Sequence, residues 1–191
     1  MDSLKDAIAD AFERHFTLYG FKDTSVDAVA RELRISKKTI YQHFASKEEI
    51  FYFVVYRSGC HLRSEVRERI RVFPTYRARV AEMVRLAFRD FAAHHAPQPA
   101  PGHRLDLQAR TRQEIVQTAT SDAFRELIHE LVVQGQAAGE FLNIPAVILE
   151  QFVHGILAQA VAIRTEQPEL QAEEEAARAV LKLLICECPE V

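Results

Sequence analysis

The segment RISKKTIYQHF, residues 34 to 44, combines basic, amide and aromatic side chains at helical spacing. With Ile40 set at zero and a step of about 100° per residue, Phe44 lies within about 40° of it, whereas Lys38 and Gln42 lie near ~160° and ~200°. Ile40 and Phe44 are therefore expected to face a core, and Lys38 and Gln42 to face solvent. The chemistry of that free face is hydrogen bonding through long polar side chains.

Lys38, Thr39 and Gln42 carry groups that contact base edges in the major groove of DNA. Lysine donates to O6 and N7 of guanine, glutamine pairs with adenine through two hydrogen bonds, and threonine meets a base edge or the thymine methyl group. Other polar residues lie where they could reach phosphates: Thr24, Ser25, Tyr41, His43 and Lys47. A short helix can also have a polar face only because that face contacts water. The elements around the segment must therefore decide between a DNA-binding face and a solvated one.

Positive charge gathers at the same segment. The chain of 191 residues has a net charge of −3, yet residues 31–47 contain five Lys and Arg against one Glu, which gives +4. A local basic surface on a mildly acidic protein indicates a binding site for a polyanion. A charged face that contacts only water is the alternative that charge alone leaves open.

The elements around the segment follow a helix-turn-helix pattern. Thr24 is predicted to cap a helix that ends in a tight turn at residues 34–35. Ser36 is predicted to cap the short helix after that turn. Ser46 and Glu49 form a capping box for the long helix that comes next.

Amphipathic helical periodicity continues through the rest of the chain, without hairpin signals. The predicted fold class is all-α, with about nine helices. A three-helix DNA-binding domain, residues 1–46, is expected to precede an effector-binding and dimerisation domain, residues 47–191. Gly20 is predicted to end the first helix. The later helices are expected to run from Lys47 towards Val72, from Pro74 to about residue 94, over about 104–118, from Ser121 to Gly139, from Asn143 to about Thr165, and from Pro168 to about Cys186.

The stretch TSVDAVARELRISKKTIYQHFASKEEIF, residues 24–51, with IADAFERHFTLYGFKDTS before it, resembles the DNA-binding domain of the TetR/AcrR family of bacterial transcriptional regulators. The resemblance extends over about residues 4–55, and its Y-x-H-F-x-S-K-E core is specific. It implies a homodimer, an effector pocket in the C-terminal domain and, as the usual mode, repression relieved by a small ligand. By motif position it implies DNA contacts from Thr24, Ser25, Lys37, Lys38, Thr39, Tyr41, Gln42, His43 and Lys47.

Arg34 departs from the family pattern. The family often has glycine at this turn position, where a positive φ angle costs little for glycine and more for other residues. Arg34 is expected either to strain the turn by about 1 kcal/mol or to add a contact to the phosphate backbone of DNA.

The effector pocket is predicted from the inward faces of the later helices. Several aromatic side chains with a few polar groups suit a largely apolar ligand with one or two polar anchors. An inward Arg112 would suit a carboxylate or phosphate. Most apolar members of the set would also serve as ordinary core. The predicted set is Tyr52, Tyr56, Met83, Phe88, Phe91, Gln108, Arg112, Phe124, Ile128 and Phe152.

The last two expected helices have apolar faces that need cover. One face consists of Val147, Ile148, Phe152 and Ile156, and the other of Ala179, Val180, Leu183 and Leu184. A two-fold four-helix interface between two chains would cover both faces. A dimer would also place two short helices on two half-sites of DNA, which multiplies a modest affinity.

Other chemistries find little support in the sequence. No motif of a hydrolase, a phosphate-binding loop, a dinucleotide site or a zinc protease occurs, so no enzyme is predicted. His94, His95 and His103 lack the spacing of a metal site, and no metal or other cofactor is expected. Three Cys without a disulfide framework indicate a cytoplasmic setting, and neither a signal peptide nor a membrane span is expected.

The resulting hypothesis is a ligand-responsive, dimeric transcriptional regulator. It would act as a repressor that binds an inverted-repeat operator and is released by a small, largely apolar effector. The alternative is a helical small-molecule-binding protein whose basic segment contacts protein partners instead of DNA. Loss of DNA binding between about 50 and 200 mM salt would favour the regulator.

Overall fold

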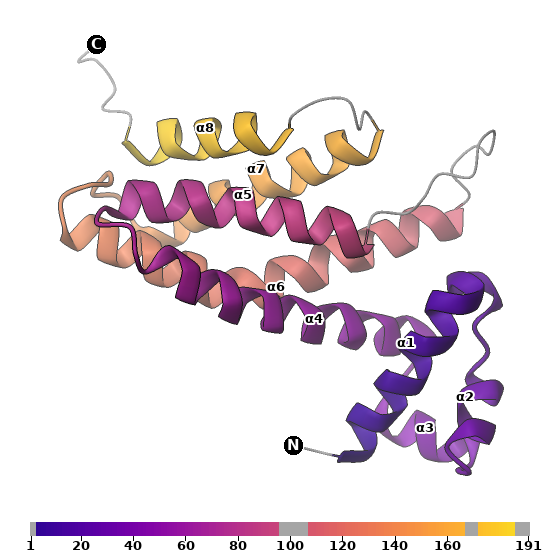
Figure 1. Cartoon of the computed structure of the whole chain (residues 1–191). Coiled ribbons are helices and arrows are strands. Elements are labelled where there is room, and N and C mark those ends of the chain that lie inside the picture. Colours follow the sequence, from indigo (N-terminus) through magenta and orange to yellow (C-terminus); the bar gives the residue numbers. More distant parts are fainter. Residues whose placement is uncertain (1–2, 96–106, 167–171, 186–191) are drawn as a thin grey trace. The chain divides into compact units, whose positions relative to one another are not determined.

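The computed structural model describes residues 3–95, 107–166 and 172–185, and the regular elements in these ranges are all α-helices (Figure 1). Side chains are described except at 90–95, 107–110, 161–162, 164–166 and 172–173. The all-α prediction is confirmed, with eight helices in the described ranges against about nine expected. They are α1 (Ser3–Asp23), α2 (Val26–Glu32), α3 (Lys37–His43), α4 (Lys47–Ile70), α5 (Tyr76–His95), α6 (Leu107–Ala137), α7 (Ala146–Glu166) and α8 (Ala172–Ile185).

The helices form two compact units. Among the described residues, the N-terminal unit holds 3–58 and 107–120, and the C-terminal unit holds 59–95, 121–166 and 172–185. Both α4 and α6 therefore contribute residues to each unit. The first half of α4 groups with α1, α2 and α3, although the sequence pattern placed a domain boundary before this helix.

The core of the N-terminal unit forms from apolar side chains spaced three or four residues apart on α1 and α4. Phe51 of α4 lies at its centre, with ring centroids 4.9 Å from Phe16 and 5.1 Å from Phe21. Ring pairs at such distances add to the stabilisation that burial provides. The large buried side chains of α1 to α4 in this unit include Ile8, Phe12, Phe21, Val26, Val29, Ile40, Phe44, Ile50, Phe51, Val54 and Val55.

Gly20 bends α1 instead of ending it. Its backbone lies at φ 77° and ψ 170°, a conformation that glycine adopts readily, and the chain continues as helix to Asp23. The Gly20 carbonyl then accepts two hydrogen bonds from Thr24, at 3.1 Å from the amide and 2.7 Å from the hydroxyl. Thr24 is thus bound to the bend, and the predicted N-cap role is wrong; Ser25 occupies the N-cap position of α2.

One long helix, α6, replaces the two helices expected over residues 104–139. Ser121 was the predicted cap of the second of these helices, but it lies inside α6. Threonines in this stretch donate their hydroxyls to carbonyls four residues earlier, as Thr118 does to Glu114 and Thr120 to Val116, each at 2.8 Å. This bonding lets hydroxyl side chains lie in a helix interior without ending it.

The end of α6 confirms the predicted stop at Gly139. Gly139 has φ 69°, the Glu140 amide donates to the Gly135 carbonyl at 2.9 Å, and the Gly139 amide donates to the Gln136 carbonyl at 3.0 Å. These two bonds define a Schellman C-cap. A side chain at Gly135 would collide with the ring of Phe141, so close packing accounts for that glycine.

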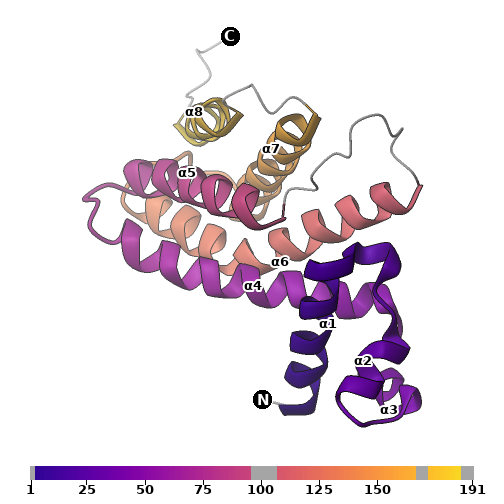
Figure 2. The same cartoon turned by 45° about the vertical axis from the view of Figure 1, so that its right-hand side comes forward.

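In the C-terminal unit, α8 lies along α5 and α7 (Figures 1 and 2). Arg85 of α5 and Glu174 of α8 form a two-point ion pair at 2.8 and 3.2 Å. Val180 and Leu184 of α8 are fully buried within the chain. The prediction of a free apolar face on the last helix is therefore wrong for these two residues, because α5 and α7 already cover them.

The described ranges were searched for a membrane-spanning helix and for a metal site. No helix there has both the length and the apolar character that a bilayer span requires. No group of three or more His, Cys, Asp or Glu in the described residues is arranged to hold a metal ion. The side chains of His94, His95, His103, Cys186 and Cys188 fall outside the described side chains.

The capping box at the start of α4 gives the first testable prediction. The Glu49 amide donates to the Ser46 hydroxyl at 3.1 Å, and the Glu49 carboxylate accepts from the Ala45 amide. Ser46→Ala should lower the free energy of unfolding by about 1 kcal/mol in urea titrations, because an amide loses its acceptor. Ser64→Ala, inside the same helix, is the control and should change it by less than about 0.5 kcal/mol. Equal losses for both variants would contradict the capping role.

Candidate nucleic-acid interface

Helix α3 is short, and its two ends are fixed by local bonds. Ser36 caps it as predicted: the Thr39 amide donates to the Ser36 hydroxyl at 3.0 Å, and the two hydroxyls lie 2.8 Å apart. Ile40 and Phe44 are fully buried. The orientation that helical periodicity predicts for α3 is therefore confirmed.

The opposite side of α3 presents polar side chains to solvent. Lys38 and Gln42 are exposed, and neither side chain has a hydrogen bond or ion pair in the described part of the chain. Tyr41, between them on the helix, is 43% exposed. A face with donors and acceptors that the protein leaves unused is what a base-reading surface requires.

Lys37 also lies on α3 but is used differently. Its ammonium group pairs with Asp27 of α2 at 2.8 Å, and the hydrogen bond to Asp27 raises the pKa of Lys37. Both side chains are largely exposed, so this pair adds little stability by itself. It links α2 to α3, and a phosphate contact from Lys37 would compete with Asp27.

A second link joins α1 to α2. Glu32 accepts hydrogen bonds from the Arg14 guanidinium, and its other oxygen lies 2.8 Å from Nε2 of His15. The hydrogen bond from Arg14 lowers the pKa of Glu32, and that from His15 lowers it further. Glu32, the acid inside residues 31–47, is thereby paired with cations of α1.

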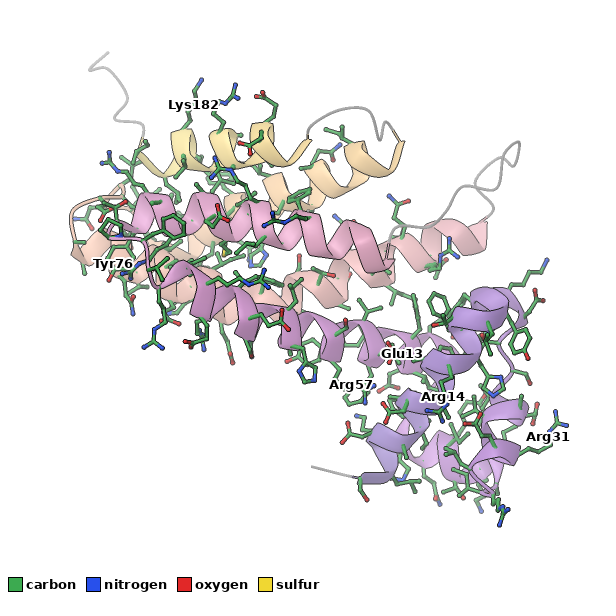
Figure 3. All side chains as sticks on the ribbon, in the orientation of Figure 1. Glu13, Arg14, Arg31, Arg57, Tyr76 and Lys182 are labelled. Carbon is green, nitrogen blue, oxygen red and sulfur yellow. The ribbon has the colours of Figure 1, made fainter. Side chains whose placement is uncertain are left out.

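A third link joins α4 to α1 through Arg57, which extends towards Glu13 (Figure 3). Its guanidinium contacts the carboxylates of Asp10, Glu13 and Asp6, the last two at 3.3 and 3.7 Å. The three acids recur at positions i, i+4 and i+7, so they share one face of α1. Sequence reasoning missed this network and the Arg14–Glu32 pair, although the spacing of the acids was a usable signal.

The turn between α2 and α3 is a Schellman motif built on Arg34. The Ile35 amide donates to the Ala30 carbonyl at 3.0 Å, and the Arg34 amide donates to the Arg31 carbonyl at 3.2 Å. This geometry requires a left-handed residue, and Arg34 has φ 56°. The expectation of a positive φ angle is confirmed. The exposed Arg34 side chain has no hydrogen bond or ion pair within the described residues.

Lys47 lies where α4 begins, beside the end of α1. Its ammonium group donates to the Lys22 carbonyl at 3.2 Å and lies 4.5 Å from the centre of the Phe21 ring. Burial lowers the pKa of Lys47. The contacts hold the amine at a defined position and use only part of its three donors.

The remaining predicted DNA contacts differ in accessibility. Thr24 is 2% exposed and its hydroxyl donates inward, so its prediction as an exposed phosphate contact is wrong. Ser25 is exposed and its side chain makes no capping bond. Thr39 and His43 are half-buried beside the polar face.

The predicted effector residues fall into both units. Met83, Phe88, Phe124 and Ile128 are buried in the C-terminal unit. In the N-terminal unit, Tyr52 and Tyr56 stack with centroids 6.0 Å apart, and Arg112 is half-buried. The side chains of Phe91 and Gln108 lie outside the described ones.

Phe152 is the predicted effector residue that the structure corrects. It lies on α7 and is 53% exposed, so it does not line an interior pocket within one chain. Val147 and Ile148, on the same helix, are exposed as well. Periodicity showed that these residues share a face but not whether another helix of the chain covers it.

Residues 8–52 match the family model described as bacterial regulatory proteins of the tetR family. Over this N-terminal segment the chain is similar to the TetR family. The matched residues include α2, the Arg34 turn and α3, which are the elements that carry the polar face described above.

Curated relatives extend this TetR-family similarity. The chain is 29% identical to the HTH-type transcriptional activator FasR of Mycolicibacterium smegmatis over 135 residues, which cover 66% of this chain and 59% of FasR. It is 43% identical over 47 residues, 25% of each protein, to YhgD of Bacillus subtilis, an uncharacterized HTH-type transcriptional regulator. The chain thus spans less than two thirds of the length of the curated relatives it matches.

Solved structures share the fold at low sequence identity. RolR without ligand has a TM-score of 0.75 at 12% identity, and the match covers 95% of this chain and 91% of RolR. QsdR of R. erythropolis, a transcriptional repressor from the TetR family, has a TM-score of 0.70 at 11% identity, with both chains fully covered. FadR from Bacillus subtilis in complex with stearoyl-CoA has a TM-score of 0.61 at 17% identity, and the match covers 94% of this chain and 96% of FadR.

The left-handed Arg34 gives a prediction about stability. An L-residue in this conformation costs roughly 1–2 kcal/mol, whereas glycine adopts it freely but gains freedom in the unfolded chain. Arg34→Gly should therefore raise the free energy of unfolding by about 0.5–1 kcal/mol in urea titrations. Arg34→Lys keeps the strain and the charge and should leave stability unchanged. A loss of stability in Arg34→Gly would contradict the strain at this turn.

Proposed function

We propose that this chain is a sequence-specific DNA-binding transcriptional regulator of the TetR family with α3 as its recognition helix. The observation that carries the proposal is the pair Lys38 and Gln42, which are exposed and have no partner among the described residues, on a helix whose other side is buried. Lysine and glutamine are residues that discriminate guanine and adenine in the major groove. The match of residues 8–52 to the family model supports the same reading.

Phosphate contacts would come from residues around α3. We assign these contacts to Ser25, Arg34, Lys37, Thr39, Tyr41, His43 and Lys47. Among them Arg34 is an addition to the usual family pattern. The positive φ of Arg34 costs conformational free energy. A contact between its guanidinium and a DNA phosphate would offset part of that cost when the protein binds DNA.

We propose that two chains bind an inverted-repeat operator as a homodimer. The exposed apolar residues Val147, Ile148 and Phe152 of α7 support this assembly, because a two-fold interface would remove them from water. Since α8 uses Val180 and Leu184 inside the chain, α7 would supply most of the apolar contact.

The proposed effector is a small, largely apolar molecule that binds in the C-terminal unit near Met83, Phe88, Phe124 and Ile128. These side chains are buried and apolar, which suits a ligand whose affinity comes from excluded water. The solved complexes of FadR with stearoyl-CoA and of RolR with resorcinol support ligand binding by this fold. We infer repression as the mode, with release on ligand binding, because this is the usual behaviour of the family.

The alternative, a helical small-molecule-binding protein whose basic segment meets protein partners, explains the charge of residues 31–47 equally well. It does not explain why Lys38 and Gln42 are exposed without a partner among the described residues, while Glu32 is paired with Arg14 and His15. The salt dependence of complex formation with DNA separates the two functions.

Substitutions on α3 and α4 test DNA recognition. Lys38→Ala and Gln42→Ala should each change the preferred base at one position of the half-site, with a loss of about 1–3 kcal/mol for the preferred sequence. Lys47→Ala should weaken binding to all duplexes alike and reduce the slope of log K against log salt by about 1 per chain. The probe is the sequence that the wild type enriches from a pool of random duplexes.

Lys182→Ala is the matched control for these variants, since Lys182 is an exposed lysine on α8 that points into solvent (Figure 3). It should keep both the sequence preference and the salt slope. Unchanged preference in both α3 variants would contradict the recognition role of α3.

The α7 face provides a test of the homodimer. Phe152→Glu places a charge where the proposed interface needs an apolar ring, and it does so twice because of the two-fold symmetry. With about 1.5–3 kcal/mol for burying each ring, dimerisation should weaken by at least about 100-fold in analytical ultracentrifugation. Val72→Glu, at an exposed valine outside α7, should leave the dimer intact. Equal dissociation constants for both variants would contradict the α7 interface.

A further inference from the structure

One of the two lysines at the start of α3 is held by an acid, and the other is not. The ammonium group of Lys37 lies 2.8 Å from Oδ2 of Asp27 on α2, ten residues earlier in the chain. Lys38, the next residue, has no partner among the described residues. Asp27 thus restrains one lysine of the basic segment and leaves its neighbour unpaired.

The two lysines also point in different directions from α3. With Ile40 set at zero and about 100° per residue, Lys37 lies near ~60° and Lys38 near ~160°. Lys37 is therefore on the flank of the helix that meets α2, whereas Lys38 faces away from the core. A lysine on the flank suits a contact to the phosphate backbone, and not to a base edge in the groove.

Asp27 presents to Lys37 the same chemistry as a DNA phosphate, which is one negative charge shared by two oxygen acceptors. The side chains of Lys37 and Asp27 are 48% and 58% exposed, so a phosphate can reach the ammonium group. The hydrogen bond to Asp27 raises the pKa of Lys37, and the lysine therefore stays charged while it is held. An exposed pair contributes little free energy, so DNA can displace it.

We propose that Asp27 competes with the DNA phosphates for Lys37 and thereby limits the affinity of the protein for any duplex, whatever its sequence. A phosphate contact from Lys37 requires either that the ammonium group leaves Asp27 or that the carboxylate stays beside a second negative charge. Both events cost free energy. Asp27 then limits the strength of binding, whereas the free face of α3 sets the preferred sequence. This inference rests on the proposed function as a DNA-binding regulator.

The salt dependence of DNA binding reports this competition. Each lysine that contacts a phosphate releases a counterion and adds about 0.9 to the steepness of log K against log salt. In the wild type, the Asp27 carboxylate that loses Lys37 takes up a cation and cancels part of that release. Asp27→Asn removes the charge that needs this cation, so the slope should steepen by about 0.5–1 per chain.

Asp27→Asn is the direct test, because it keeps the shape of the side chain and removes its charge. Binding to the duplex that the wild type enriches and to a random duplex should both strengthen by about two- to fivefold per chain, the equivalent of one exposed ion pair. The preferred bases should not change. Fluorescence anisotropy between about 50 and 200 mM salt measures affinity and slope. Asp27→Ser replaces this variant if urea unfolding shows that Asp27→Asn is not folded.

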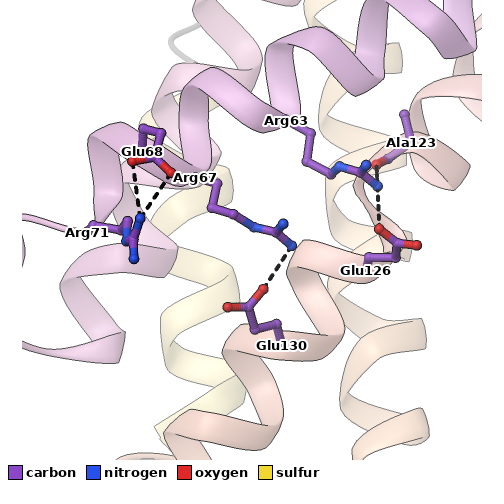
Figure 4. Close-up of polar contacts among 7 residues, drawn as sticks. All are labelled: Arg63, Arg67, Glu68, Arg71, Ala123, Glu126 and Glu130. Atoms are coloured by element: carbon purple, nitrogen blue, oxygen red, sulfur yellow. Dashed lines mark hydrogen bonds and ion pairs between the residues drawn. The ribbon is translucent and has the colours of Figure 1, made fainter.

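A matched control comes from an ion pair of the C-terminal unit. Arg67 of α4 donates to Glu130 of α6, also at 2.8 Å (Figure 4), and the two side chains are 39% and 41% exposed. Glu130→Gln removes one negative charge from a pair of the same length, whose cation is not a proposed DNA contact. It should leave affinity and salt slope unchanged.

Two further variants separate the competition from a general effect of charge. Asp27→Glu keeps the negative charge and should bind DNA as the wild type does. In a Lys37→Met background, Asp27→Asn should lose most of its effect, because no ammonium group remains to be released.

Two results would overturn the inference while the proposed function stands. One is a folded Asp27→Asn with the affinity and salt slope of the wild type on the enriched duplex. The other is an equal gain from Asp27→Asn with and without Lys37, since that gain would come from the lost negative charge alone. A wild type that enriches no sequence would contradict the proposed function. The competition is then judged by the same slopes on a random duplex, and no binding to any duplex overturns both.

Discussion

The burial of one side of α3 is the constraint on which the rest of the site depends. Ile40 and Phe44 are removed from water, and the Phe44 ring contacts Phe53 of α4 edge to face at 5.6 Å. Lys5 of α1 lies 5.1 and 4.7 Å from the centres of these two rings. A seven-residue helix cannot hold its shape alone in water, so these contacts define α3. By fixing the buried side they also determine which side chains remain free for a ligand.

The charged residues of the N-terminal unit also differ between the inside of the domain and the free side of α3. Acids are paired with cations inside the domain, Glu32 with Arg14 and Asp27 with Lys37, while Lys38 on the free face has no acidic partner among the described residues. The exposed pairs contribute little to stability. The excess of Lys and Arg over residues 31–47 makes the local field more positive than the net charge of −3 suggests.

Features set by neighbouring residues were predictable from the sequence. The caps at Ser36 and Ser46, the stop at Gly139 and the left-handed Arg34 depend on a few consecutive residues, and the structure agrees with each. Features that depend on packing between distant residues were not predictable from the sequence. Ser121 offered a cap that the continuous α6 does not use, and the bend at Gly20 decides the burial of Thr24. The exposure of Phe152 depends on which helices cover α7, and no local pattern contains that information.

Amide hydrogen exchange of the full chain, with and without the duplex it enriches from a random pool, tests the central claim most directly. If α3 is the recognition helix, the duplex should slow exchange mainly across α3 and the start of α4, with weaker protection at the turn that contains Arg34. Protection confined to other helices, or none on a duplex that binds, would contradict the assignment of α3 as the DNA-reading element.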